Sequence, residues 1–131
     1  MRIEGAKPRA AKQSFRDLQV WQRSMELTNA VYRLTQAFPR EEAFGLTSQL
    51  RRAAVSISSN IAEGHARMNP REFKRFLLIA RGSNCELQTQ LEVATGMGFG
   101  DSHLLVRVQG VSQEVENMLF ALLGRLRTNS A

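Results

Sequence analysis

The sequence contains few residues of the kinds that define disulfide, metal or membrane proteins. Its 131 residues include one cysteine, Cys85, and two histidines, His65 and His103. A single cysteine excludes an internal disulfide and is typical of a reducing compartment. No run of about 18 apolar residues occurs, so we expect no membrane-spanning segment. The basic N-terminus lacks the apolar stretch of a secretory signal, and we therefore predict a cytoplasmic protein.

Catalytic and metal-binding patterns are missing as well. Ala62 and Gly100 stand three residues before the two histidines, so the Glu-x-x-His pair of di-iron bundles is absent. Glu63 could act as an acid, but we favour an ion pair with Arg67 one helical turn away. We therefore expect no cofactor, no metal and no enzymatic activity. An enzyme that uses Glu63 with neighbouring arginine or serine side chains is kept as a rival hypothesis.

Strand-like alternation of apolar residues is absent too, and helical periodicity takes its place. We predict helices over about 17–37, 46–66, 70–95 and 102–127, with glycines at 96, 98 and 100 ending the third. Ser14 or Asp17 should cap the first helix. Asn69, Pro70 and Glu72 form a start signal with a capping box. Short connections favour an all-α, antiparallel, up-down-up-down four-helix bundle over residues 15–128.

Two core positions carry particular expectations. Asn84 lies in the apolar seam of the third helix and should be a buried amide that fixes register. The first helix has two apolar seams, and the second one includes Val20, Leu27, Val31 and Leu34. A second seam implies either a wider core or a subunit contact. On the second alternative, Leu27→Glu should separate subunits without unfolding them.

A polar stripe runs along the second helix beside its apolar face. It recurs at helical spacing through Gln49, Arg52, Ser56, Asn60, Glu63 and Arg67, and Gly64 follows it. Such a stripe must bond to neighbours, water or a ligand. We interpret Ser56, Asn60, Glu63 and Gly64 as a structural motif. Loss of Asn60 or Glu63 should then cost about 1–3 kcal/mol of stability.

The charge balance is basic, with 18 Lys and Arg against 12 Asp and Glu, and 15 of the 18 are arginine. Residues 1–14 have no periodicity, and we predict a flexible basic arm. The candidate nucleic-acid-binding residues are Arg67, Arg71, Lys74, Arg75, Arg81, Arg51 and Arg52. The alternative is a solvated helix face. Since we see no aromatic side chains among these cations, we expect phosphate contacts without base stacking.

Several segments together resemble a known family. They are FRDLQVW at 15–21, FPREEAFGL at 38–46, QLRR at 49–52, SISSNIAEG at 56–64 and EFKRFLLIARGS at 72–83, followed by Glu86 and Leu87. This pattern, spanning about residues 15–127, resembles the four-helix-bundle proteins encoded by intervening sequences in bacterial large-subunit ribosomal RNA genes. It is also similar to the accessory variability determinant proteins of diversity-generating retroelements.

The resemblance implies an antiparallel four-helix bundle that assembles into a ring of five copies. It also implies a basic surface that engages nucleic acid and, in the retroelement branch, a reverse-transcriptase partner. It supplies no catalytic residues. We therefore predict a non-enzymatic homo-oligomer that binds RNA in preference to DNA through backbone phosphates. The alternative is a protein-interaction scaffold, such as an accessory partner of a reverse transcriptase, without a nucleic-acid role of its own.

Overall fold

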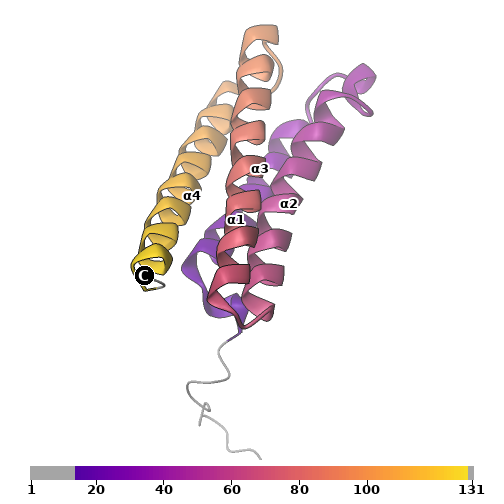
Figure 1. Cartoon of the computed structure of the whole chain (residues 1–131). Coiled ribbons are helices and arrows are strands. Elements are labelled where there is room, and N and C mark those ends of the chain that lie inside the picture. Colours follow the sequence, from indigo (N-terminus) through magenta and orange to yellow (C-terminus); the bar gives the residue numbers. More distant parts are fainter. Residues whose placement is uncertain (1–13, 130–131) are drawn as a thin grey trace, which may run out of the picture.

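The computed structural model describes residues 14–129, and these form four α-helices joined by short connections. The helices are α1 (Gln19–Thr35), α2 (Leu46–Ala66), α3 (Pro70–Met97) and α4 (Ser102–Asn129). Short 3₁₀ turns, η2 (Phe15–Asp17) and η3 (Arg40–Glu42), precede α1 and α2. No strand occurs among the described residues. Figure 1 shows the helices side by side, and the predicted four-helix bundle is confirmed.

Side-chain bonds between helices show that neighbours in sequence pack antiparallel. Ser24 on α1 bonds to Ser58 on α2, and Thr35 near the end of α1 accepts from Arg51 near the start of α2. The same reversal holds for α3 and α4, where Arg81 pairs with Glu116 and Gln88 bonds to Ser112. Helix α4 returns to α1, and Arg23 lies 3.4 Å from Glu114. The four helices therefore enclose one core.

The ends of α2, α3 and α4 follow local sequence signals, except that the predicted capping box of α3 is incomplete. Asn69 Oδ1 accepts from the backbone N–H groups of Arg71 and Glu72 at 2.9 and 3.0 Å, as a cap of α3 should. The Glu72 carboxylate pairs with Arg75 instead of completing a capping box. Helix α2 has the predicted bounds, and Asp101 caps α4 through two backbone N–H groups.

The start of α1 differs from the prediction. Ser14 and Asp17 form a capping box, but they cap the 3₁₀ turn η2 and not α1. Leu18 then has an extended backbone (φ −76°, ψ 126°), so α1 begins only at Gln19. Of the predicted basic arm, residues 1–13 lie outside the described residues, whereas Ser14 belongs to the fold.

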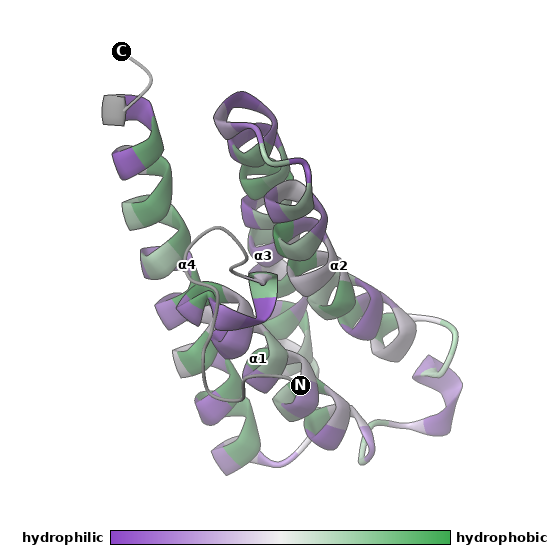
Figure 2. Ribbon diagram, turned by 90° about the horizontal axis from the view of Figure 1, so that it is seen from below, coloured by the Kyte–Doolittle hydropathy of each residue, from purple (hydrophilic) through white to green (hydrophobic). Residues whose placement is uncertain are grey.

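The core is built from the second apolar seam of α1. Leu27, Val31 and Leu34 are fully buried, and Val20 and Phe38 are nearly so. Figure 2 shows the apolar sides of the helices turned toward one another. The other seam is only partly exposed: Thr28 is buried, Leu18 and Trp21 pack against the core, and its last residue, Tyr32, is 41% exposed. Leu27 is therefore a core residue of the single chain, and the expectation that Leu27→Glu would separate subunits without unfolding them is wrong.

Hydroxyl and amide groups form a polar layer at mid-height of the bundle. Ser24 and Ser58 join α1 to α2 at 2.9 Å, and Ser56 and Ser83 join α2 to α3 at 2.8 Å. Asn84 is fully buried, as predicted. It accepts from the Ser112 hydroxyl at 2.8 Å and donates to the Ser112 carbonyl at 3.0 Å, which joins α3 to α4. We refer to these six residues as the polar layer.

Candidate nucleic-acid interface

The polar stripe of α2 is used for helix packing. Asn60 donates to the carbonyl and the hydroxyl of Ser56, at 2.8 and 3.1 Å, and Ser56 bonds onward to Ser83 of α3. Gly64 is buried against α3. A Cβ atom at Gly64 would lie 2.6 Å from Cβ of Phe76. Ser56, Asn60 and Gly64 therefore hold α2 against α3.

Glu63 has a different environment from the rest of the motif. Its side chain is exposed, and its carboxylate lies 3.3 Å from the Arg67 guanidinium. The expectation of a stability cost from a buried Glu63 is therefore wrong, because the group is solvated. The ion pair with Arg67, which we favoured over an acid role, is present.

Arg51 is committed to the contact between α1 and α2. Its Nε donates to the Thr35 hydroxyl at 2.8 Å, and one terminal nitrogen donates to the Tyr32 carbonyl at 3.5 Å. Its guanidinium also lies 4.5 Å from the centre of the Tyr32 ring. These contacts fix Arg51 along α1, so it has little freedom to reach a phosphate.

Arg67 and Arg75 cover one buried aromatic ring. Their guanidinium carbons lie 5.0 and 4.6 Å from the centre of Phe76, within range of a cation–π contact. Arg75 also pairs with Glu72 at 3.2 Å. Both arginines are at the surface, but each has a carboxylate beside it that offsets part of its charge.

Arg81 is held between α3 and α4. Its Nε donates to Glu116 at 2.7 Å, and its guanidinium carbon lies 5.5 Å from the centre of the Phe120 ring. The hydrogen bond to Glu116 and the charge of the same carboxylate raise the pKa of Arg81 further above its usual range. Phe120 is 64% exposed. The expectation that no aromatic accompanies the cations is therefore wrong.

Four predicted cations have no carboxylate partner in the described part of the chain: Arg51, which bonds to α1 instead, and Arg52, Arg71 and Lys74. Arg71 and Lys74 lie in the first turns of α3, and Arg52 lies in the first half of α2. The antiparallel packing brings the end of α4, with Arg125 and Arg127, to the same end of the bundle as the start of α3. The sequence prediction missed these two residues, because only the pairing of α3 with α4 brings them to that end.

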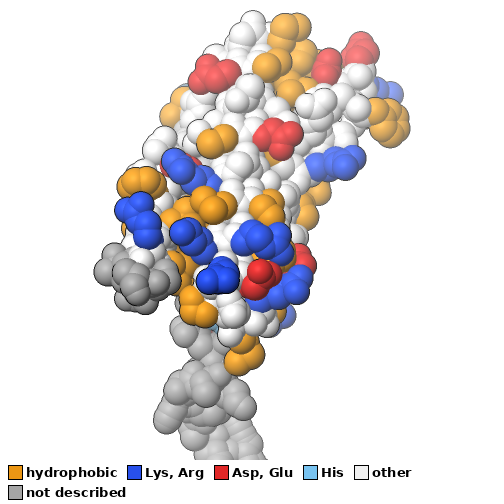
Figure 3. Space-filling model, viewed as in Figure 1, with side chains coloured by type: hydrophobic (Ala, Val, Ile, Leu, Met, Phe, Trp, Pro, Cys, Tyr) orange, Lys and Arg blue, Asp and Glu red, His pale blue; other side chains and the backbone are white. Residues whose placement is uncertain are grey.

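The net charge of the described chain lies in one half of the bundle. The half formed by residues 14–27, 57–85 and 112–129 holds nine Lys and Arg against six Asp and Glu. We call it the basic half. The other half, residues 28–56 and 86–111, holds five of each sign, and we call it the neutral half. In Figure 3 the Lys and Arg side chains gather over the lower part of the molecule, which belongs to the basic half.

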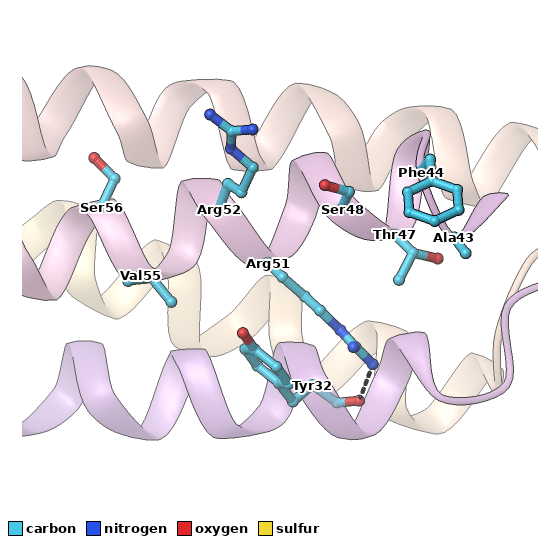
Figure 4. Close-up of a pocket in the computed structure, with 9 residues that line it drawn as sticks. All are labelled: Tyr32, Ala43, Phe44, Thr47, Ser48, Arg51, Arg52, Val55 and Ser56. Atoms are coloured by element: carbon cyan, nitrogen blue, oxygen red, sulfur yellow. Dashed lines mark hydrogen bonds between the residues drawn. The ribbon is translucent and has the colours of Figure 1, made fainter.

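The neutral half carries an open groove between the start of α2 and the end of α1. The groove has a volume of about 560 Å³ and its walls include Tyr32, Phe44, Arg51, Arg52 and Val55. Figure 4 shows Arg51 crossing toward Tyr32, with Phe44 at one end. Phe44 is 99% exposed. Phe44 is thus a large apolar side chain left almost wholly to solvent at the groove.

Neither a metal centre nor a membrane span is found among the described residues. No group of three or more His, Cys, Asp or Glu side chains in this part of the chain could hold a metal ion. None of the helices there is long and apolar enough to cross a bilayer.

The fold and its surface define a small four-helix-bundle protein with one basic half. A family profile described as "23S rRNA-intervening sequence protein" matches residues 16–121. The chain belongs to this family. A crystal structure from Bacteroides thetaiotaomicron, of a protein of unknown function from the S23 ribosomal protein family, has a similar fold. The TM-score is 0.70 at 20% identity, over 79% of this chain and 97% of that one. A comparison with curated protein sequences gave no match.

Proposed function

We propose that this protein is a non-enzymatic, cytoplasmic homo-oligomer that binds RNA through backbone phosphates, with the basic half facing the RNA. The observation that carries the proposal is the concentration of the described net charge in that half, where Arg71 and Lys74 have no carboxylate partner among the described residues. Arginine and lysine side chains that are not neutralised release counterions from a nucleic acid when they bind it. The family's association with ribosomal RNA intervening sequences favours RNA over DNA as the ligand.

The neutral half is suited to self-association. It carries equal numbers of charges of each sign, so two copies can approach there without net repulsion. It also exposes most of the large apolar side chains at the surface: Tyr32, Phe44, Val55, Val93, Met97 and Val106. We favour a ring of five copies, as the resemblance implies. Five chains of charge +6 would carry +30, and repeated weak contacts along one RNA gain avidity.

Phe44 and its groove also support a second candidate function. The same exposed ring beside an open groove suits a different protein chain, such as a reverse transcriptase. In that case the chain would be an accessory scaffold, and its basic half would have no nucleic-acid role. RNA binding by the purified protein distinguishes the two functions.

Reversing the two unpaired cations of α3 tests the phosphate contacts. Arg71→Glu combined with Lys74→Glu should weaken RNA binding roughly tenfold or more at low salt, because two attractive charges become repulsive. The slope of log affinity against log salt should fall by about 0.7–0.9 for each phosphate that the variant no longer neutralises. Glutamate suits the first turns of a helix, so folding should be preserved. Fluorescence anisotropy with labelled ribosomal RNA fragments over a salt series measures both quantities.

A matched control makes the same charge change in the neutral half. Arg33 and Arg107 are exposed and have no ion pair among the described residues. Arg33→Glu with Arg107→Glu should therefore reduce affinity much less than the α3 pair, compared in protein that light scattering shows to keep its oligomer mass. Equal losses in the two double variants would mean that only total charge matters. Affinity that does not change with salt would contradict phosphate binding.

Phe44 offers a test of assembly. Because its side chain is 99% exposed, Phe44→Ser should leave the stability of the single chain within about 0.5 kcal/mol. The same change should shift the oligomer toward monomer, since it removes an apolar side chain from the proposed contact. Multi-angle light scattering reports the mass. Met68→Ser is the control, because Met68 is 86% exposed but lies in the basic half. Wild-type protein that is monomeric at micromolar concentration would overturn the oligomer.

A further inference from the structure

Phe120 is an aromatic side chain on the basic half, and packing within the single chain leaves most of it exposed to solvent. It lies on α4 with 64% of its surface exposed. On the adjacent helix α3, the guanidinium carbon of Arg81 lies 5.5 Å from the centre of the Phe120 ring. Figure 3 shows hydrophobic and basic side chains intermixed over the lower part of the molecule. A ring in such a setting is available to a ligand.

Arg81 is better suited to hold a planar group than to bind a phosphate. The Glu116 carboxylate, 2.7 Å away, neutralises it and would repel an approaching phosphate. The same ion pair holds the guanidinium in place between the two helices, so binding would cost little further side-chain freedom. Unpaired RNA bases stack on both aromatic rings and guanidinium planes. Phe120 and Arg81 thus present both kinds of surface side by side.

The α3 cations that have no carboxylate partner among the described residues lie on the same stripe of the helix surface as Arg81. Arg71, Lys74, Leu78 and Arg81 are spaced by three, four and three residues, which places them along one face of the helix. The ten residue steps from Arg71 to Arg81 span about 15 Å. Leu78, which lies between Lys74 and Arg81, is half exposed. The stripe therefore leads from phosphate-binding cations at the start of α3 to the Phe120 ring.

We propose that Phe120 and Arg81 form a stacking site for an unpaired RNA base, with Arg71 and Lys74 holding the adjacent phosphates. This inference rests on the proposed RNA-binding function and narrows its ligand to single-stranded or looped RNA. In a duplex the bases are stacked on one another, and the deep, narrow major groove of A-form RNA excludes side chains. A continuous duplex can therefore satisfy the cations but cannot use the ring.

The test measures how substitutions of Phe120 change the affinity of the protein for two RNAs. One RNA is a labelled strand that does not pair with itself, and the other is the same strand annealed to its complement. Phe120→Leu keeps an apolar side chain but removes the π face. It should weaken binding of the single strand about 5- to 150-fold, the range expected for one stacked base. Binding of the duplex and the salt slope should not change, and Phe120→Tyr should restore binding of the single strand.

The control truncates an exposed side chain of the basic half that lies off the stripe and outside the proposed self-association surface. Ile79 of α3 is 42% exposed, so Ile79→Ala should leave both affinities unchanged. If Phe120→Leu binds both RNAs as wild type does, the stacking site is overturned and the proposed function stands. A change of oligomer mass on Phe120→Leu would instead make Phe120 a contact between copies, which also overturns the site. Wild-type protein that binds neither RNA would overturn the site and the proposed function together.

Discussion

Leu27→Glu should unfold the bundle. Leu27 is fully buried in the core of a single chain, where it packs with the neighbouring core residues of α1. Truncating such a leucine to alanine already costs about 2–5 kcal/mol. An unpaired carboxylate at the same place adds several kcal/mol of desolvation. The sum approaches the whole stability of an ordinary domain, about 5–15 kcal/mol. Circular dichroism should show loss of helix without a cooperative melting transition.

The matched control introduces the same charge on the solvated side of α1. Asn29 is exposed and lies two residues further along the helix. Asn29→Glu should melt within a few degrees of wild type, and Leu27→Ala should fold with a lower melting temperature. A folded Leu27→Glu protein of reduced oligomer mass would contradict the core assignment and place Leu27 at a contact between copies.

Gly64→Ala should destabilise the protein by a net of about 1–2 kcal/mol, although alanine is the better helix former. The added Cβ would lie 2.6 Å from Cβ of Phe76 and 3.2 Å from Cδ1 of Phe73. The Phe76 Cβ is fixed to the backbone of α3, so one helix must move away from the other. Overpacking of this kind costs about 1–3 kcal/mol or more, which exceeds the gain of about 1 kcal/mol in helix propensity. Urea unfolding measures the difference.

Gly82 provides the opposite case in a neighbouring helix. A Cβ at Gly82 would meet no atom within 4 Å, and the residue lies within α3. Gly82→Ala should therefore stabilise the protein by about 0.5–1 kcal/mol. The same glycine-to-alanine change should thus lower the stability of the protein at position 64 and raise it at position 82. Stabilisation by Gly64→Ala would show that α2 and α3 are not held at this distance in solution.

The bounds of the helices were predictable where one local signal decides them. Asn69 and Pro70 start α3 because a side-chain acceptor and a fixed φ are both supplied within two residues. The start of α1 was not predictable in this way. The capping box of Ser14 and Asp17 is equally compatible with a 3₁₀ turn, and the extended Leu18 that separates η2 from α1 has no sequence signature.

The candidate site was harder to predict, because its chemistry depends on pairing between helices. Periodicity identified two seams on α1, but it could not say which one faces the core of the same chain. The partner of Arg81 is Glu116, 35 residues away, and the bond depends on the relative register of α3 and α4. The contacts of Phe120 and Arg51 were not predictable for the same reason, since their partners lie on other helices.

The polar layer has a mechanical consequence for the bundle. Apolar side chains of similar size can exchange neighbours when one helix slides past another, so an all-leucine seam resists shear only weakly. Moving any helix by one turn, about 5.4 Å, would separate hydroxyl or amide groups that are now 2.8 to 2.9 Å apart. Each separated buried pair would cost about 1 kcal/mol or more. The polar layer should therefore hold the four helices in one register when the bundle is loaded along its axis.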